Sequence, residues 1–404
     1  MSRPASVAIV GGGVAGFTTA SALRDLGFDG GVTIVESEPA SYDRPPLSKA
    51  AFVEGAPLES LAFASPESLA ARRIEVLPNA AAVALEPDAG RVVLDDGREV
   101  RAEAIVVATG ARARRPAFPG ADLEGVLTLR TFRDAQAIRR AAQPGARVLV
   151  LGAGLIGAEL ASGLRTLGTD VVLVDRNVVP LARLLGGAFA ARLHAMHAEH
   201  GVDVRVGGVA AVERAGGRLR ATLADGSSAV VDAVVAGLGA EPNAALAVTA
   251  GLEIADGVVV DREGRASHPG VFAVGDVARR RSSDGTLEPR DEHWEAAQLA
   301  AHAVAAAIVG VDPPRPTAAW YWSDRYGIHL EVVGRLVGDG DEVLRDGAPD
   351  AVFRVADGVL VGAATIDDPM TVRAARRVID RRVPVDPTRL ADPAFELRAL
   401  LRGG

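Results

Sequence analysis

A glycine-rich segment near the N-terminus lies between a short apolar run and a helix-forming stretch, and it restricts the possible folds more strongly than any other part of the chain. The run 6–10 predicts a strand, the glycines lie within 11–16, and 17–26 is rich in Ala and Leu. A second apolar run, 31–36, ends in Glu36. This succession is the pattern of a βαβ unit that binds a dinucleotide.

The glycines and the acid of this unit have separate expected tasks. Gly11 makes the turn, Gly13 lets the backbone approach a pyrophosphate, and Gly16 lets the helix pack closely on the strand. The helix N-terminus offers free N–H groups and the positive end of its dipole to the phosphates. Glu36 can accept hydrogen bonds from the ribose hydroxyls. Glycine clusters also mark plain turns, but with its strand, helix and acid this one predicts a dinucleotide site.

The same pattern returns later in the chain. A predicted strand over 147–151 leads into a glycine turn over 152–157, a helix over 158–167 and a strand over 170–175 that ends in Asp175. Two complete copies indicate two bound dinucleotides, because a protein that binds one nicotinamide cofactor does not need the second.

The acid of the second copy bears on the choice of nicotinamide cofactor. Asp175 would accept a hydrogen bond from a ribose 2′-OH and would repel a 2′-phosphate, so the sequence favours NADH over NADPH. The neighbouring Arg176 weakens this preference, because an arginine there can pair with a phosphate.

The composition excludes several kinds of redox centre. The chain has no cysteine, so it has no disulfide, thiolate metal site, iron–sulfur cluster or redox-active thiol pair of its own. Of its 44 lysines and arginines, Lys49 is the single lysine. A GC-rich coding bias explains the arginines, and chance would explain one remaining lysine. The alternative is that Lys49 occupies a site where a planar guanidinium cannot replace a compact ammonium.

Charge and hydropathy exclude further classes of function. The net charge of −8 argues against nucleic acid as the main partner. No apolar run reaches the length of a membrane span, and the N-terminal residues read as a strand rather than a secretory signal. We therefore expect no membrane partner and a cytoplasmic location.

The rest of the chain completes the two units and adds a third part. A chain of 404 residues predicts two or three domains. The runs 105–110 and 234–239 predict buried strands that each close one dinucleotide unit, and 292–309 predicts an Ala-rich helix. The strand expected over 271–276 ends in an acid. After a proline-rich linker at 312–316, short alternating segments with Gly turns predict a small β-rich domain.

Two less generic motifs carry a resemblance to a known family. Residues 42–49 read Tyr-Asp-Arg-Pro-Pro-Leu-Ser-Lys, and residues 320–326 read Trp-Tyr-Trp-Ser-Asp-Arg-Tyr. Nearly the whole chain resembles the NADH-dependent, FAD-containing ferredoxin reductases of bacterial oxygenase and cytochrome P450 systems, the family of putidaredoxin reductase and rhodocoxin reductase. Supporting pieces are 108–112, 154–159, 274–276 and 292–294.

The resemblance implies a fold and a division into domains. The expected fold class is α/β, with two Rossmann-like dinucleotide-binding domains of the glutathione-reductase-like kind and a small α+β C-terminal domain. The FAD-binding domain would comprise 1–112 and 239–312, the inserted NAD-binding domain 113–238, and the C-terminal interface domain 313–404.

The resemblance also implies the residues that hold FAD and NAD(H). Lys49 and Glu159 are the expected catalytic pair: Lys49 would stabilise negative charge on the reduced flavin, and Glu159 would fix its position near the nicotinamide. No metal site is expected. The expected FAD-binding residues are Gly11, Gly13, Ala15, Gly16, Glu36, Arg44, Pro45, Lys49, Ala82, Val83, Thr109, Gly110, Arg130, Asp276, Trp294 and Trp322. The expected NAD-binding residues are Gly152, Gly154, Leu155, Ile156, Gly157, Glu159, Asp175, Arg183 and Gly239.

Some positions depart from the family's pattern. Asp43 and Glu295 stand where the family usually has Glu and Asn, and Arg325 replaces a usual Gln. Glu295 and Arg325 lie near positions that shape the flavin edge and the partner surface, so they bear on partner identity and leave the chemistry unchanged. Two interpretations of Trp320 and Trp322 stay open. Both are core aromatics, or one of them lies over or beside the flavin.

The implied reaction converts a two-electron donor into a one-electron donor. NADH gives a hydride to the flavin, a [2Fe–2S] ferredoxin takes electrons singly, and the ferredoxin serves a downstream oxygenase. Two other functions stay open: an NADH oxidase or diaphorase that uses oxygen or quinones, and a redox-sensing flavoprotein similar to apoptosis-inducing factor. The protein is expected to be a monomer or a homodimer.

Two clusters of basic side chains are interpreted as ordinary surface, and a third offers candidates for contact with a partner. His194, His197 and His200 recur on one predicted helix and indicate a solvated face rather than a metal site. The run 279–281 predicts a solvated loop. C-terminal arginines are candidates for contact with an acidic ferredoxin; they are Arg373, Arg376, Arg377, Arg381, Arg382 and Arg398.

Overall fold

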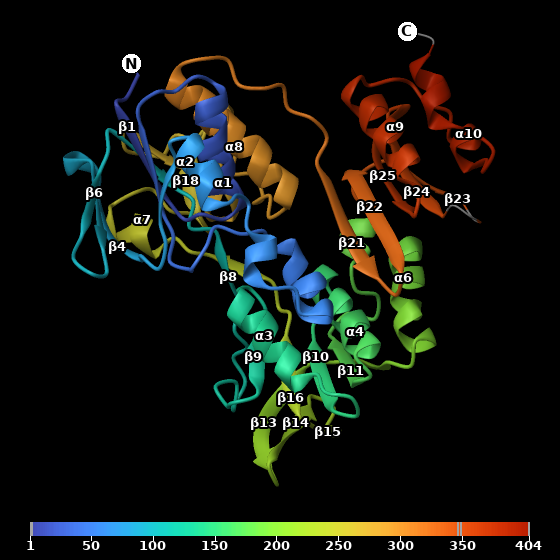
Figure 1. Cartoon of the computed structure of the whole chain (residues 1–404). Coiled ribbons are helices and arrows are strands. Elements are labelled where there is room, and N and C mark those ends of the chain that lie inside the picture. Colours follow the sequence, from blue (N-terminus) through green and yellow to red (C-terminus); the bar gives the residue numbers. More distant parts are fainter. Residues whose placement is uncertain (1–2, 346, 348–349, 403–404) are drawn as a thin grey trace. The chain divides into compact units, whose positions relative to one another are not determined.

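The computed structural model describes residues 3–345, 347 and 350–402 (Figure 1). The chain forms two compact units, each built from three separated segments. The first unit comprises Met1–Pro46, Ala56–Arg112 and Ala240–Pro316, and the second comprises Leu47–Gly55, Ala113–Gly239 and Thr317–Gly404. The short segment Leu47–Gly55 therefore belongs with the second unit, although its sequence neighbours on both sides belong to the first.

The centre of the first unit is a five-stranded parallel sheet. Its strands are β1 (Ser6–Val10), β2 (Gly31–Val35), β3 (Glu75–Leu77), β7 (Ala104–Val107) and β19 (Val271–Ala273). Their order is β19-β7-β1-β2-β3. The chain adds β2 and β3 on one side of β1 and then β7 and β19 on the other, so the strand order reverses between β1 and β7. In sheets of this kind, ligands bind beyond the carboxyl ends of the strands at the reversal.

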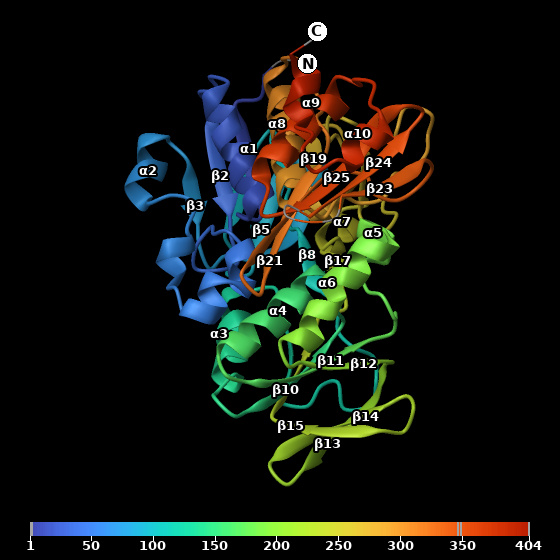
Figure 2. The ribbon, with the colours of Figure 1, turned by 90° about the vertical axis from the view of Figure 1, so that its right-hand side faces the viewer.

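Both faces of this sheet are covered, which explains its uninterrupted apolar strands. Helices α1 (Val14–Asp25) and α8 (Trp294–Val309) lie side by side on the face that carries Val7 and Ile9 (Figures 1 and 2). Ala8 and Val10 face the opposite cluster, to which α7 (Ala245–Thr249) and a small antiparallel sheet contribute. That sheet consists of β4 (Ala82–Glu86), β5 (Arg91–Leu94) and β6 (Glu99–Arg101).

The structure corrects two local expectations in the first unit. Helix α1 begins at Val14, three residues before the predicted start, because Gly13 is already its N-cap. The expected loop at Arg279–Arg281 is wrong, since β20 (Ala278–Arg280) pairs in parallel with β18 (Val258–Val260). The first unit also contains α2 (Pro66–Ala71).

The second unit repeats the parallel sheet in the same order. Its strands run β12-β11-β10-β16-β9, with the reversal between β10 and β16. The bounds are β9 (Val126–Thr128), β10 (Arg147–Leu151), β11 (Asp170–Asp175), β12 (Asp203–Val206) and β16 (Ala233–Ala236). The helices are α3 (Phe132–Ala141), α4 (Leu155–Thr166), α5 (Ala182–Leu185) and α6 (Gly187–Glu199). An antiparallel sheet of β13 (Val209–Ala215), β14 (Arg218–Leu223) and β15 (Ser228–Val231) extends the unit.

The C-terminal part of the second unit is an antiparallel sheet with helices, which confirms the predicted α+β character. Its strands are β21 (Trp320–Arg325), β22 (Ile328–Gly334), β23 (Asp341–Arg345), β24 (Ala351–Ala356) and β25 (Val359–Ile366), in the order β21-β22-β25-β24-β23. Helix α9 (Pro369–Asp380) packs on the face with Val333 and Phe353, and α6 packs on the face with Val332 and Val352. Helix α10 (Pro387–Ala391) follows.

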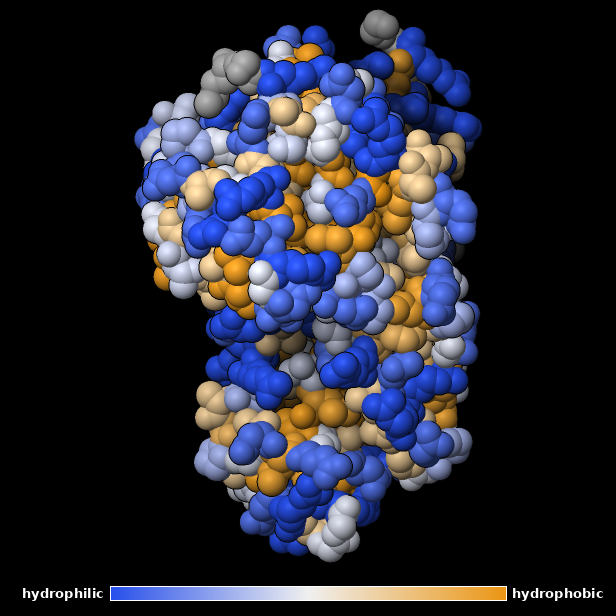
Figure 3. All heavy atoms as spheres, turned by 60° about the vertical axis from the view of Figure 1, so that its left-hand side comes forward, coloured by the Kyte–Doolittle hydropathy of each residue, from blue (hydrophilic) through white to orange (hydrophobic). Residues whose placement is uncertain are grey.

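The surface mixes polar and apolar residues. On the face shown in Figure 3, hydrophilic residues lie between smaller apolar areas. Among the described residues, no helix combines the length and the apolar character that a membrane crossing requires.

Candidate functional site

The first glycine turn has the geometry that a pyrophosphate requires. Gly11 has φ +107°, and a Cβ there would lie 2.3 Å from the carbonyl oxygen of Ala108. A Cβ on Gly16 would lie 1.9 Å from the oxygen of Gly11, so both positions admit only glycine. A Cβ on Gly13 would meet only the Arg44 side chain, at 3.9 Å, and among the described residues no side chain caps the α1 N-terminus that Gly13 begins. The turn therefore leaves space for a phosphate group, and the free N–H groups at the start of α1 can donate to its oxygens.

Glu36 ties the end of β2 to this turn. Its carboxylate is buried and accepts hydrogen bonds from the N–H groups of Gly12, at 2.7 Å, and Glu38, at 2.8 Å. Burial raises the pKa of Glu36, and the two backbone N–H groups oppose that rise. The acid is thus held beside the glycine turn, where a ribose would follow a bound pyrophosphate.

Other expected FAD-binding residues gather around the same sheet edge. A Cβ on Gly275 would lie 2.8 Å from Ala15 Cβ, so the turn that carries Asp276 lies against the start of α1. The N–H of Ala80 donates to the oxygen of Glu36, which brings the following strand β4 to the carboxyl end of β2. The register of β4 shifts between Ala82 and Ala84, and the Val83 side chain there is exposed.

The first part of the 42–49 motif, up to residue 46, and the helix start at Trp294 meet within the first unit. Trp294 Nε1 donates to Asp43 Oδ1 at 2.8 Å, so the shortened acid at position 43 still reaches the indole. Arg44 pairs with Glu38 at 3.0 Å, and Pro45 follows it in the chain.

Thr109 and Gly110 follow β7 and are hydrogen-bonded to Asn243, near the start of the segment Ala240–Pro316 of the same unit. Thr109 Oγ1 donates to the oxygen of Asn243 at 2.8 Å, and the Asn243 side chain donates back to the oxygen of Thr109. The N–H of Asn243 also donates to the oxygen of Gly110. Three expected FAD-binding residues belong instead to the second unit; they are Lys49, Arg130 and Trp322.

The second glycine turn repeats the first. Gly152 has φ +98°, a Cβ there would lie 2.3 Å from the oxygen of Gly237, and a Cβ on Gly157 would lie 1.9 Å from the oxygen of Gly152. Gly154 has no atom within 4 Å of its Cβ position, and no side chain caps α4. Leu155 and the exposed Ile156 form the first turn of that helix. This turn also fits a pyrophosphate.

Asp175 occupies the position that Glu36 has in the first unit. Its Oδ2 accepts from the N–H of Ala153 at 2.8 Å, and its Oδ1 accepts from the N–H and the side-chain amide of Asn177. Sequence reasoning missed Asn177, which the spacing of two residues after a strand-end acid could have indicated. Arg183 is exposed on α5, and Gly239, with φ +87°, follows β16.

Glu159 is the hub of a cluster within the second unit. Its side chain is only 6% exposed. Lys49 Nζ lies 2.8 Å from Glu159 Oε2, and the expected pairing is present. Ser48 Oγ also donates to Oε2, at 2.5 Å, while Ser323 Oγ and the N–H of Asp324 donate to Oε1 at 2.8 and 3.0 Å. Four donors therefore hold one buried carboxylate.

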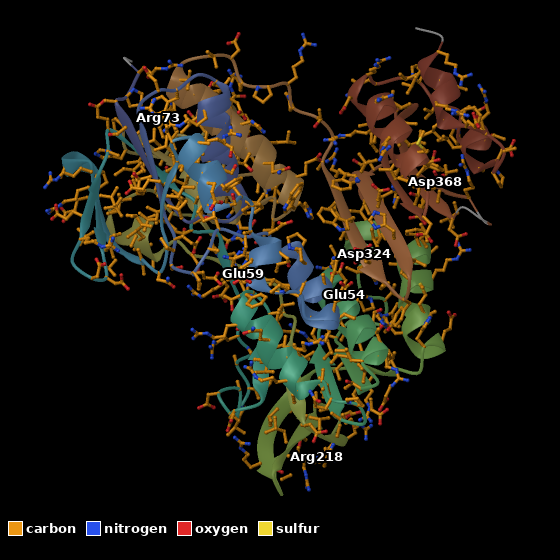
Figure 4. All side chains as sticks on the ribbon, in the orientation of Figure 1. Glu54, Glu59, Arg73, Arg218, Asp324 and Asp368 are labelled. Atoms are coloured by element: carbon orange, nitrogen blue, oxygen red, sulfur yellow. The ribbon has the colours of Figure 1, made fainter. Side chains whose placement is uncertain are left out.

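The β21–β22 hairpin supplies a second set of polar and aromatic groups around Lys49. Asp324, labelled in Figure 4, has Oδ2 at 3.5 Å from Lys49 Nζ and Oδ1 at 2.6 Å from His329 Nδ1. Lys49 Nζ lies 6.0 Å from the centre of the Trp322 ring, which stacks on Trp320. Sequence reasoning missed Asp324 and His329 as members of this cluster. They are direct cross-strand partners, which only the hairpin register reveals.

Behind Glu159 lies a buried cation. The Arg325 side chain is 3% exposed, and its Nη2 donates to Ser323 Oγ at 3.1 Å. Burial lowers the pKa of Arg325, and Glu159 opposes that effect. The departure from the usual Gln at this position therefore adds a buried positive charge that is linked to Glu159 through Ser323 Oγ.

The histidine face of α6 is not uniformly solvated. His197 is buried and its Nδ1 lies 2.6 Å from Tyr326 Oη, so the expected solvated face is wrong at this position. Burial lowers the pKa of His197 to about 3, which keeps the imidazole neutral near pH 7. The reason is that α6 packs against the C-terminal sheet, whose strands lie far from it in the sequence.

Two family descriptions match the chain, and the first covers both glycine turns. Residues 5–307 match the family described as pyridine nucleotide-disulphide oxidoreductase, and residues 320–401 match the family described as reductase C-terminal. The chlorobenzene dioxygenase ferredoxin reductase component of Cupriavidus sp. (strain PS12) is 40% identical to this chain, with 98% of this chain and 97% of the relative covered. The chain belongs to the ferredoxin reductases among the pyridine nucleotide-disulphide oxidoreductases.

Other members of the ferredoxin reductase family show the same full-length likeness. The putidaredoxin reductase of Pseudomonas putida is 33% identical over 98% of this chain and 96% of that protein. The crystal structure of a covalent putidaredoxin reductase–putidaredoxin complex superimposes with a TM-score of 0.91 at 31% identity, covering 98% of both chains. FAD and NAD(H) are the cofactors of this family, and this oxidoreductase has two turns that fit them.

Proposed function

We propose that this chain takes a hydride from NADH through bound FAD and passes electrons singly to a [2Fe–2S] ferredoxin that serves an oxygenase. The observation that carries the proposal is the pair of matching glycine turns, each with a helix N-terminus and a hydrogen-bonded acid, in a chain without cysteine. Relatives of similar length are named as ferredoxin reductase components of dioxygenase systems, and a similar chain was solved as a complex with putidaredoxin.

The two cofactors are assigned to different turns. Gly11, Gly13, Gly16 and Glu36 would hold the pyrophosphate and ribose of FAD. Gly152, Gly154, Gly157 and Asp175 would hold those of NADH. The remaining assigned residues would complete the two sites: Ala15, Arg44, Pro45, Lys49, Ala82, Val83, Thr109, Gly110, Arg130, Asp276, Trp294 and Trp322 for FAD, and Leu155, Ile156, Glu159, Arg183 and Gly239 for NADH.

The reaction must balance two electrons against one-electron acceptors. Bound FAD supplies the conversion, because it accepts a hydride and releases electrons one at a time. One NADH and two oxidised ferredoxins give one NAD⁺, two reduced ferredoxins and one proton. The chain has no cysteine that could store the electrons in a disulfide, so they leave from the flavin.

The protein's own groups position charge for this reaction. The Lys49 ammonium would stabilise the negative charge that a hydride brings to the flavin, and Glu159 would fix that ammonium. Glu159 is itself fixed by Ser48, Ser323 and the N–H of Asp324, so the pair is organised before any cofactor reacts. Such preorganised charges cost no rearrangement in the reaction step.

The partner and the location are proposals of the same kind. A small acidic ferredoxin would meet exposed arginines of the C-terminal part. Arg398 is paired with Glu396, whereas Arg381 is exposed at the end of α9, which makes Arg381 the better candidate. We place the protein in the cytoplasm, as a monomer or homodimer.

The test is NADH-driven reduction of candidate [2Fe–2S] ferredoxins, followed by the ferredoxin spectrum under anaerobic conditions. The expected result is a ferredoxin that accepts electrons much faster than oxygen consumes NADH in its absence. If oxygen or quinones are reduced as fast as every ferredoxin tried, the oxidase or diaphorase function replaces this proposal.

A further inference from the structure

Lys49 lies between two carboxylates rather than one. Its Nζ is 2.8 Å from Glu159 Oε2 and 3.5 Å from Asp324 Oδ2. The Glu159 carboxylate already accepts hydrogen bonds from three other donors, and one of them, Ser323 Oγ, also accepts from Arg325 Nη2. Asp324 is therefore the second, separate negative charge that the ammonium meets.

Asp324 has only partial compensation of its own. Its side chain is 38% exposed, and its Oδ1 lies 2.6 Å from His329 Nδ1. The other imidazole nitrogen, Nε2, lies 4.0 Å from the buried carboxylate of Glu331. Because His329 holds one oxygen of Asp324, the other oxygen stays turned toward Lys49.

We infer that Asp324 sets the reduction potential of the bound flavin by offsetting the charge of Lys49, and that His329 is the residue that positions Asp324. This inference rests on the proposed role of Lys49 beside the flavin. A negative charge next to the ammonium weakens the field that favours the reduced, anionic flavin. Asp324 thus makes NADH a slightly weaker driver of flavin reduction and makes the reduced enzyme a stronger donor to a one-electron acceptor.

The variant that tests this is Asp324→Asn. It removes the charge but keeps the shape, the backbone N–H that binds Glu159, and an oxygen that can still accept from His329. We expect the midpoint potential of the bound FAD to become more positive by about 30 mV, an equilibrium constant change of about tenfold for a two-electron couple. Anaerobic spectroelectrochemistry measures this without NADH, ferredoxin or turnover.

The two half-reactions should respond in opposite directions. Reduction by NADH should proceed at least as fast as in the wild type, and electron transfer to ferredoxin should slow. A purely structural role for Asp324 would slow both reactions and would leave the potential unchanged. The matched control is Asp341→Asn, which neutralises an exposed carboxylate at the opposite edge of the same sheet and should change neither.

His329 is tested through its coupling to Asp324. In His329→Leu, Asp324 loses its contact with the imidazole and can turn away from Lys49. The midpoint potential of the bound FAD should therefore become more positive, by less than in Asp324→Asn. The double variant should match Asp324→Asn alone, because the imidazole acts only through the carboxylate. Additive shifts would overturn the positioning role.

A reference variant separates failure of this inference from failure of the proposed function. Lys49→Met should make the potential more negative. If Lys49→Met shifts the potential and Asp324→Asn does not, the inference about Asp324 is wrong and the role of Lys49 stands. If neither variant shifts it, Lys49 does not act on the flavin, and both the inference and that part of the proposed function are wrong.

Discussion

Replacing Lys49 by Met would remove the ammonium from Glu159 while keeping an unbranched side chain. Glu159 keeps its hydrogen bonds from Ser48, Ser323 and the N–H of Asp324, so the carboxylate should stay in place and the fold should survive. Loss of one preorganised charge at a site of developing negative charge costs on the order of 10²-fold in rate, a barrier increase of about 2.7 kcal/mol. We therefore expect hydride transfer from NADH to slow by about that factor.

Stopped-flow mixing of the FAD-bound variant with NADH under anaerobic conditions measures this step directly from the loss of flavin absorbance. The FAD content per protein should stay near the wild-type value, since the glycine turn and Glu36 belong to the other unit. Lys49→Arg is the matched control: it keeps the charge but presents a planar fork in place of a compact ammonium, so a smaller loss is expected. Reduction of the Met variant at the wild-type rate would show that Lys49 is structural and would refute its assigned role.

Three further expectations follow from other parts of the structure. Asp175→Ala should narrow the preference for NADH, because it removes both the ribose acceptor and the repulsion of a 2′-phosphate; steady-state kinetics with both cofactors check this, and comparable efficiencies in the wild type would contradict the cofactor assignment. Arg381→Glu should raise the KM for ferredoxin, and higher salt should weaken binding of ferredoxin to the wild type, while the rate of ferricyanide reduction stays constant. The reason is that physiological salt screens the attraction between charges more than about 8 Å apart. A KM for ferredoxin that does not depend on salt would argue against charge steering. Because the pKa of His197 is lowered to about 3, the unfolded state binds more protons than the folded state between that value and the ordinary histidine pKa. The free energy of unfolding should therefore fall as pH drops through this window. In His197→Gln the slope of the unfolding free energy against pH should be smaller, and an unchanged slope would contradict this expectation.

The glycine turns and their acids were predictable because their constraints are local. The steric demands at Gly16 and Gly157 arise from Gly11 and Gly152 of the same turns, and those at Gly11 and Gly152 arise from Ala108 and Gly237, which directly follow the neighbouring parallel strands. Strand, turn and helix follow one another without a gap, so spacing alone places the acid at the end of the next strand. The errors there were small, such as the start of α1 at Val14, because the N-cap glycine belongs to the turn motif itself.

The Lys49 cluster was predictable only in part, because its members come from four separate elements. The Lys49–Glu159 pair came from a resemblance, since nothing local indicates which helix the 42–49 motif meets. Asp324 and His329 face one another through the register of the β21–β22 hairpin, which depends on the turn at Tyr326 and Gly327.

His197 shows the same limit in another form. Its hydrogen-bond partner is Tyr326, whose Oη lies 2.6 Å from His197 Nδ1 and whose ring meets the imidazole edge-on, and Tyr326 is distant in the sequence. A residue pattern on one helix cannot show what another segment places upon it.

The division of the segments between the two units has a consequence for how the chain folds during synthesis. The polypeptide passes from one unit to the other after residues 46, 55, 112, 239 and 316. The first unit therefore cannot close until β19 and α8 have left the ribosome, and Leu47–Gly55 must wait for partners that include α4 and β21. Domains generally fold as units during synthesis, the N-terminal one first. This chain lacks that order, so we expect its yield to depend on chaperones that shield the early strands, and no cut at a single position should release a self-sufficient half.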